Sequence, residues 1–202
     1  DSVVHSEGIT ALQTVAGGVP NTVTLLHSTV VAGPEGTAFI LAKGDSASVT
    51  ASVLQGGWLG AYCEGSILFA ASVVYRPGIP VNPPDSLCSD SDLSGAVLAD
   101  PGLAGWPHDS RLRPGGAAVD LVDDGPWPVD VEGRARPIDG DGDGTARSDA
   151  GAWEMVPRGI AGRVMSLNLG AGLGGVCVTA WADGVGELRI PLRPGEGEPT
   201  SA

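Results

Sequence analysis

Short apolar stretches recur at a regular distance along the first 76 residues of the chain. Units of two small residues followed by two apolar residues begin at Ser28, Ala51 and Ala71, at intervals of 23 and 20 residues. A stretch of alternating polar and apolar residues precedes each unit, at 22–26, 47–50 and 66–69. Alternation with a period of two is typical of β-strands. We therefore expect two short strands per repeat, stacked as the coils of a β-solenoid.

Such a solenoid would bury ladders of Val, Leu and Ile, because each coil covers the apolar face of its neighbour. Small residues such as Ser28, Ser52 and Ala71 would fit the corners at which the chain bends between sheets. Residues 9–15 would form one strand before the repeats. An ordinary β-sandwich whose strands have similar spacing is the alternative.

The pattern changes after the third repeat. Four prolines between residues 77 and 84 predict extended or turn structure, and residues 115–125 predict one further strand that ends in an acidic turn. Alternating stretches at 164–169, 176–181 and 187–192 predict a small β-meander. The chain would thus divide into a solenoid with a closing Asp/Gly-rich segment (1–157), a small β-domain (158–193) and a tail or linker (194–202).

The composition agrees with an all-β protein and argues against two classes of partner. The 202 residues include 32 glycines and 16 prolines, a density that indicates many turns and disfavours a helical bundle. The formal net charge is -13, so the chain lacks the basic surface by which nucleic acids or anionic membranes are bound. The sequence holds no apolar run long enough to span a bilayer, and we expect no transmembrane segment.

The cysteines suggest a disulfide between Cys63 and Cys88. The two residues bracket the third repeat and the proline-rich loop, so a bond between them would tie this loop back to the coil that it leaves. Such a bond needs an oxidising compartment, and two buried thiols are the alternative. A single lysine and abundant Gly, Asp, Ser and Thr fit an extracellular protein.

An Asp/Gly loop at residues 139–145 is the strongest candidate for a metal site. Aspartates at every second position, followed by a glycine, match positions 1, 3, 5 and 6 of a calcium-binding loop. The expected calcium ligands are Asp139, Asp141, Asp143, the carbonyl of Thr145, and Asp149. Position 12, which usually carries a bidentate acid, is Ala150. The alternative is an acidic turn whose side chains cap local N–H groups.

Several stretches together carry a family resemblance. They are the coil-like unit 23–33, Cys63 with Cys88 and the later Asp100-Pro101, the segment 112–120 (LRPGGAAVD), and the segment 133–154, which ends in DAGAWE. In these stretches the chain resembles bacterial secreted right-handed parallel β-helix proteins of the choice-of-anchor Q domain type. Ala150 and Trp153 stand where that family has Ile and Tyr, and Gly116-Ala117 stands where it has Ser-Pro.

The resemblance covers about two thirds of the chain and implies both a fold and a location. The fold would be the C-terminal part of a right-handed parallel β-helix, and the protein would be secreted or displayed on the cell surface. In the closing coil, Asp149 and Glu154 would accept backbone N–H groups and Trp153 would cover the last ladder. The resemblance carries no catalytic residues, because the family is defined by its architecture.

The sequence favours a non-catalytic role over an enzyme. The coils at 22–76 carry only scattered charges, such as Lys43, Asp45, Glu64 and Arg76, where a polysaccharide lyase needs stacked acids and a base. We expect a structural, adhesive or glycan-contacting module, in which loop tryptophans such as Trp58 could meet a polysaccharide or cell-surface glycan. The alternative is the C-terminal part of a β-helix polysaccharide lyase or glycoside hydrolase whose active face lies upstream of residue 1.

Overall fold

A computed structural model describes residues 2–15, 17, 19–77, 93–123 and 127–157, and the backbone of 177–182 and 186–191. All regular structure in these residues is β, so none of them belongs to a helix that could cross a membrane. The chain divides into two compact units, 1–157 and 158–202.

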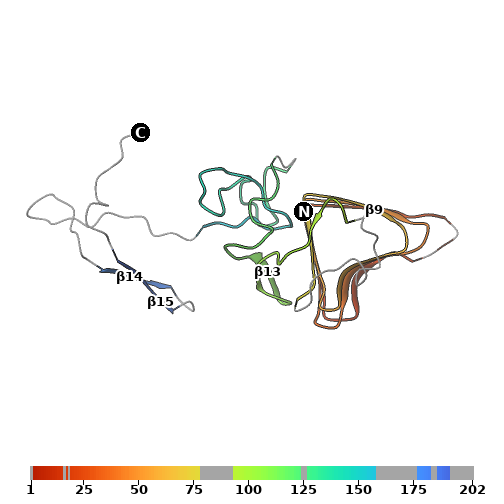
Figure 1. Cartoon of the computed structure of the whole chain (residues 1–202), viewed down its shortest axis with the longest axis horizontal. Helices are drawn as coiled ribbons and strands as arrows, with labels where there is room; N and C mark the ends of the chain where they lie inside the picture. The colour runs from red at the N-terminus through yellow and green to blue at the C-terminus, as the bar shows by residue number, and fades with distance from the viewer. Residues whose placement is uncertain are drawn as a thin grey trace, which may run out of the picture. The chain divides into compact units, whose positions relative to one another are not determined.

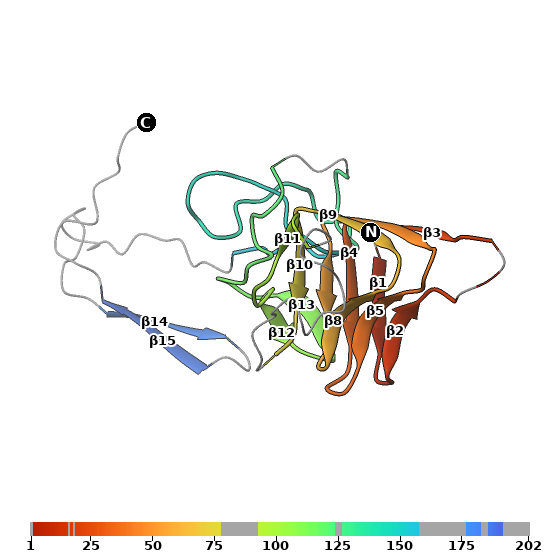
Figure 2. The same ribbon diagram turned by 45° about the vertical axis from the view of Figure 1, so that its right-hand side comes forward.

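Three parallel sheets form the stacked part of the first unit (Figures 1 and 2). Sheet 1 holds five strands in the order β1 (Ser2–Ser6), β4 (Ser28–Ala32), β7 (Val53–Gln55), β10 (Ser72–Tyr75) and β11 (Ala96–Val97). Sheet 2 holds β2 (Thr10–Gln13), β5 (Thr37–Leu41) and β8 (Leu59–Cys63). Sheet 3 holds β3 (Thr22–Leu26), β6 (Ser46–Thr50) and β9 (Ser66–Ala70).

The chain visits the three sheets in turn, so each coil contributes one strand to every sheet. Neighbouring strands are parallel and in register, as between β3, β6 and β9. The predicted parallel β-solenoid is therefore confirmed, with about three turns. Each coil has three strands where the sequence predicted two, because β5 and β8 lack the alternating pattern and are buried at almost every position.

Ladders of apolar side chains fill the interior. Val30, Leu54 and Val74 occupy equivalent places on β4, β7 and β10. On sheet 3, Val49 of β6 pairs with Phe69 of β9, and both side chains are buried. The residues on either side of them along each strand point outward. This alternation explains why the strands of sheet 3 were visible in the sequence.

The corner between sheet 3 and sheet 1 is built alike in all three coils. His27, Ala51 and Ala71 adopt positive φ angles of 43°, 49° and 45°. The serine that follows each of them is buried. The hydroxyls of Ser52 and Ser72 each accept the N–H of the serine one coil earlier, Ser28 and Ser52, both at 3.1 Å. Of the small residues expected at the corners, Ser28 and Ser52 thus belong to a hydrogen-bonded serine ladder, whereas Ala71 is the residue that turns the chain.

The segment that follows β11 packs against the outer face of sheet 1. Val31, Val53 and Val73 point outward from this sheet and form a second core with Leu103, Ala118, Val122 and Ala150. The only strands in this part of the described chain besides β11 are β12 (Leu103–Gly105) and β13 (Asp109–Leu112), an antiparallel pair. The Asp/Gly-rich segment, expected as the closing coil, thus lies along the side of the stack.

The strand predicted at 115–125 is not formed by its described residues, 115–123. Residues 117–120 form turns, and Val122 makes an isolated antiparallel bridge to Ser148. Gly115 and Asp120 have positive φ angles of 78° and 52°, which an extended strand does not tolerate. The buried Ala118 and Val122 meet the outer core from this folded loop rather than from a strand.

The second unit contains one described hairpin. Strands β14 (Cys177–Ala182) and β15 (Gly186–Pro191) are antiparallel, with Cys177 opposite Pro191 and Ala182 opposite Gly186. They correspond to the last two strands of the predicted meander. The strand expected at 164–169 lies outside the described residues, as does Cys88, so the Cys63–Cys88 disulfide stays a prediction.

Candidate functional site

The Asp/Gly loop folds around its own carboxylates. Asp139 accepts two backbone N–H groups, from Gly142 to Oδ1 at 2.7 Å and from Gly144 to Oδ2 at 3.0 Å. Gly142 and Gly144 have φ angles of 80° and 93°, which explains why glycine occupies both positions. The loop is therefore held in a tight turn by hydrogen bonds that need no metal ion.

The loop also brings two of its acids together with a third from a distant segment. Asp120, Asp139 and Asp141 each offer one carboxylate oxygen, and these three oxygens lie within 4.8 Å of one another. Asp120 reaches the loop by accepting the N–H of Asp141 at 2.7 Å. Three clustered carboxylates are a donor set that suits a hard cation such as Ca²⁺.

Asp143 and Asp149 of the predicted calcium set do not join this group of carboxylates. Asp143 is exposed, and its Oδ1 accepts the N–H of Thr145 at 2.7 Å. Asp149 is buried and accepts the N–H of Asp120 at 2.8 Å. The side chain of Asp149 thus faces the interior. The carboxylates that lie close enough to share a cation are Asp139 and Asp141, which the spacing predicted, and Asp120, which it did not.

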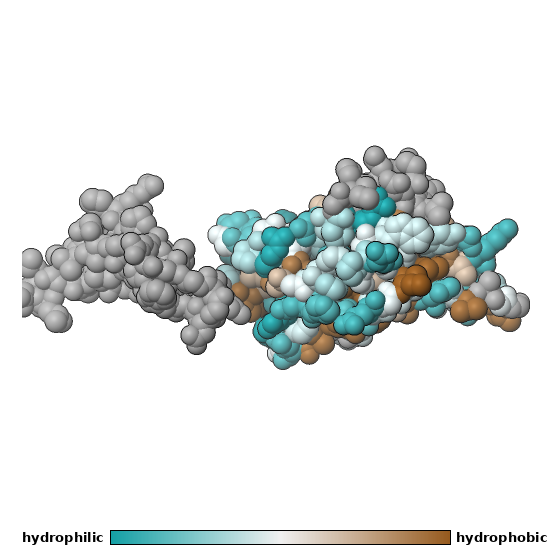
Figure 3. Space-filling view, turned by 90° about the horizontal axis from the view of Figure 1, so that it is seen from below, coloured by the Kyte–Doolittle hydropathy of each residue, from teal (hydrophilic) through white to brown (hydrophobic). Residues whose placement is uncertain are grey.

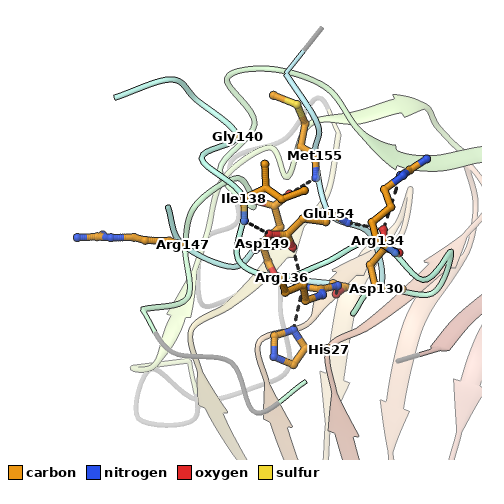
Figure 4. Close-up of polar contacts among 12 residues, drawn as sticks. His27, Asp130, Arg134, Arg136, Ile138, Gly140, Arg147, Asp149, Glu154 and Met155 are labelled. Atoms are coloured by element: carbon orange, nitrogen blue, oxygen red, sulfur yellow. Dashed lines mark hydrogen bonds and ion pairs between the residues drawn. The ribbon is translucent and has the colours of Figure 1, made fainter. Parts of the chain in front are cut away.

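A second polar cluster lies buried where the segment meets the first corner (Figure 4). We call it the charge clamp; its members are His27, Asp130, Arg136, Asp149 and Glu154. The Arg136 side chain donates to His27 Nδ1 at 3.2 Å and to the carbonyls of Asp149 and Gly151, both at 2.9 Å. It also pairs with Glu154 at 3.1 Å, and neither side chain is exposed. One arginine therefore fastens the segment to the solenoid corner.

The acids of the charge clamp act mainly as acceptors for backbone N–H groups. Glu154 accepts from Ile138 at 2.9 Å and from Asp149 at 3.2 Å. Asp149 accepts from Met155 as well as from Asp120, and Asp130 accepts from Glu154 at 3.1 Å. The expectation that Asp149 and Glu154 accept backbone N–H groups is confirmed.

Burial sets the protonation of these groups. Desolvation, assisted by the Arg136 guanidinium, lowers the pKa of His27 from 6.5 to about 4, so that its imidazole is neutral at pH 7. Burial raises the pKa of Asp149 from 3.8 to about 7, against the opposing effect of its two N–H donors. Burial likewise raises the pKa of Glu154 and lowers that of Arg136.

The tryptophans divide into anchors and exposed rings. Trp106 donates its indole N–H to the carbonyl of Ala32 at 3.2 Å, and Trp153 donates to Ser110 Oγ at 3.0 Å. Trp153 thus contacts the β12–β13 hairpin, whereas we expected it over the last ladder. Trp58, between β7 and β8, is 60% exposed and is the better candidate for an external ligand.

Sequence reasoning missed Asp120, His27 and Arg136. Asp120 precedes the acidic loop by about twenty residues, and nothing in the local spacing links the two. His27 is the corner residue of the first repeat, where φ is positive. In the sequence, His27 occupies the same position of its repeat as Ala51 and Ala71. This position identifies a corner residue, but it does not show that Arg136 contacts it.

Comparison with known proteins gives no relative for this chain: no family model, no curated protein and no solved structure matches it. The functional conclusion therefore rests on the geometry of the chain itself.

Proposed function

We propose that this chain is a non-catalytic β-solenoid module of a secreted or cell-surface protein, with a structural or adhesive role that includes contact with glycans. It resembles the bacterial choice-of-anchor Q domain type in the segments named above. The observation that carries the proposal is the regular, uncharged outer face of sheet 3.

This face, which we call the hydroxyl face, presents side chains in straight rows across three strands. Thr22, Ser46 and Ser66 form one row, and the Oγ atoms of the first two lie 3.1 Å apart. Thr24 and Ser48 begin the next row, which ends at Leu68 with 66% of its surface exposed. Hydroxyls both donate and accept hydrogen bonds, which suits them to the hydroxyls of a sugar.

The row spacing follows from the fold. Parallel strands lie about 4.8 Å apart, and alternate residues along a strand are about 6.7 Å apart. The hydroxyl face is therefore a lattice of mostly Ser and Thr side chains, which lose little conformational entropy on binding. Such a lattice fits an extended, repeating polymer better than a compact small molecule.

The charged residues of the coils have structural tasks. Asp45 is buried and accepts the N–H of Asn21 at 2.8 Å, which lowers its pKa. Glu64 accepts the Tyr62 hydroxyl at 3.0 Å, and Arg76 donates to the carbonyl of Trp58 at 3.1 Å. These roles support a scaffold rather than a row of acids and bases across a cleft.

The visible surface also fits an adhesive module. On the face shown in Figure 3, apolar atoms occur in small groups among hydrophilic ones. A surface of this kind favours many weak polar contacts over one large hydrophobic interface.

A binding assay on immobilised polysaccharides tests the proposal. We expect retention on at least one neutral or acidic glycan and at least tenfold weaker binding for Thr24→Glu/Ser48→Glu, which places charge on the hydroxyl face. Gln13→Glu/Ser94→Glu adds the same charge at exposed positions elsewhere and is the matched control. Equal binding by both variants would reject the hydroxyl face as the contact.

The same samples can be used to test whether the protein is a polysaccharide lyase. Uronate polymers incubated with the protein should yield no unsaturated product. Accumulation of that product would overturn the non-catalytic assignment.

We further propose that Ca²⁺ binds at the acidic loop and stabilises it. The support is the convergence of Asp120, Asp139 and Asp141, with an affinity in the weak range of extracellular sites. Asp141→Asn should weaken binding, measured by calorimetry, at least tenfold. Asp143→Asn should leave calcium affinity nearly unchanged if the ligands are Asp120, Asp139 and Asp141, and should weaken it if the ligands are those predicted from the loop spacing. The absence of both heat and a change in melting temperature would exclude the site.

A further inference from the structure

Two of the three histidines meet beside a carboxylate on the surface of the first unit. The rings of His5 and His108 lie edge to face with their centroids 6.0 Å apart. His108 Nδ1 lies 3.6 Å from Oε1 of Glu7. The group is separate from the acidic loop, the charge clamp and the hydroxyl face, and none of these features accounts for it.

The fold brings these side chains together from two elements. His5 lies on β1, in register with Val31, which points from sheet 1 toward the outer core. His108 lies in the turn between β12 and β13. This turn is fixed over the end of β4, since Trp106 donates to the carbonyl of Ala32 at 3.2 Å. Gly33 N donates to the carbonyl of Ser6 at 2.9 Å, which holds the end of β1 beside it.

The donor set matches a borderline transition-metal cation. Imidazole nitrogen binds Zn²⁺ and Ni²⁺, and a carboxylate oxygen commonly completes such sites, whereas Ca²⁺ prefers oxygen alone. In a tetrahedral zinc site with bonds of about 2.1 Å, two ligand atoms lie about 3.4 Å apart. The 3.6 Å between His108 Nδ1 and Glu7 Oε1 is close to that separation.

The side chain of His5 must turn before all three residues can share one ion, because their ligand atoms do not all lie within 4.8 Å of one another. The side chains of His108 and Glu7 are 71% and 75% exposed, so both can adjust without disturbing the core. His5 is exposed as well, so its ring is free of the packed core. We propose that His5, Glu7 and His108 bind a divalent transition-metal cation, with water filling the remaining position.

A bound ion would join the first coil to the β12–β13 hairpin. The three ligands come from segments about 100 residues apart in the sequence, so the ion would close a long loop. It would stabilise the folded chain by mass action, because the unfolded chain does not hold the three ligands together.

Calorimetry with ZnCl₂ on the full chain, carrying no polyhistidine tag and freed of metal by chelation, tests the site. We expect one ion per chain and a rise in melting temperature. His5→Ala and His108→Ala should each weaken binding at least tenfold, and Glu7→Gln should weaken it less.

Two controls locate the ion. Glu35→Gln removes an exposed acid from the neighbouring turn and should leave binding unchanged. Asp141→Asn alters the acidic loop and should do the same. Absence of zinc binding would overturn the proposal, and so would binding that survives both histidine substitutions or is lost in Asp141→Asn alone.

Discussion

Arg136 is a buried arginine that links the segment 127–157 to the corner of the solenoid. Its guanidinium is removed from water and is compensated by Glu154, two carbonyls and the imidazole of His27. A buried ion pair contributes little over a well-packed apolar pair, yet removing one partner leaves an uncompensated charge. Arg136 therefore holds the segment 127–157 in place through several hydrogen bonds and not through the ion pair alone, although its Nε has no partner.

Substitution of Arg136 by Met should lower the free energy of unfolding by about 3–5 kcal/mol, because Glu154 is left buried without its counter-charge. Urea denaturation followed by circular dichroism gives the value. Arg113→Met is the matched control: the side chains of Arg113 and Asp100, which pair at 2.7 Å, are 52% and 46% exposed, and loss of this pair should cost less than about 1 kcal/mol. Equal losses in the two variants would contradict the role given to Arg136.

The charge clamp also predicts two opposite pH dependences. His27 has a lowered pKa in the folded state, so its contribution to stability is present above pH 6.5 and is lost as the pH falls toward about 4. Asp149 has a raised pKa, so its contribution is present near pH 4 and is lost as the pH rises through about 7. Between pH 4 and 6.5 the two effects oppose each other in the wild type.

Single substitutions should uncover the two dependences. The stability of the wild type minus that of His27→Asn should fall on acidification from pH 6.5 to 4, by up to about 1.4 kcal/mol per pH unit. The corresponding difference for Asp149→Asn should rise over the same acidification. Denaturant titrations at several pH values, in the presence of a chelator, provide both curves. Two differences of the same sign would refute the assignment.

At the scale of elements, the corner between sheets 3 and 1 shows how a short repeat is specified. A positive φ angle turns the chain, and the next residue is a buried serine that bonds to the neighbouring coil. Ser52 also donates to the carbonyl of Thr50 at 2.8 Å. Each serine thus satisfies backbone groups that the turn would otherwise leave unpaired inside the protein.

Ser52→Ala should therefore destabilise the protein by about 1–3 kcal/mol, the cost of leaving the Ser28 N–H buried without an acceptor. Ser48→Ala removes a hydroxyl from the hydroxyl face and should change stability by less than about 0.5 kcal/mol. Thermal or urea unfolding measures both. A neutral effect of Ser52→Ala would mean that the ladder contributes nothing to the stack.

The sequence predicted the strands of sheet 3 and the buried strands β4, β7 and β10, but it missed β5 and β8. The strands of sheet 3 were found because Ile67 and Phe69 alternate with exposed neighbours. Strand β5 was missed because Ala38 and Phe39 are both buried, which removes the alternation. The strand expected at 115–125 failed because a Gly-rich apolar run also fits a folded loop that packs on a core.

The sequence also predicted only part of the candidate calcium site. Local spacing identified Asp139 and Asp141, which lie in one turn and meet in the structure. It could not identify Asp120, because only the packing of residues 93–157 on sheet 1 brings it there. Asp149 was assigned to the metal by its proximity in sequence, although its burial turns it toward backbone N–H groups.

At the scale of the whole first unit, two cores share one sheet. The inner core fills the stack, and the outer core lies between sheet 1 and residues 93–157. The outer core is closed at one corner by the charge clamp, and Gly151 N donates to the carbonyl of Ala51 at 2.8 Å. We expect the stack and the segment 127–157 to unfold together, because neither covers its apolar face alone.

Hydrogen exchange of the backbone amides tests this central claim most directly. The amides of Gly151, Ala152 and Glu154 bond to Ala51, Thr29 and Asp130, so they should be protected to the same extent as those of Val30 and Leu54 in the stack. All five should then exchange with the free energy of global unfolding. Rapid exchange at 151–154 beside a protected stack would show that the segment is not part of the folded unit.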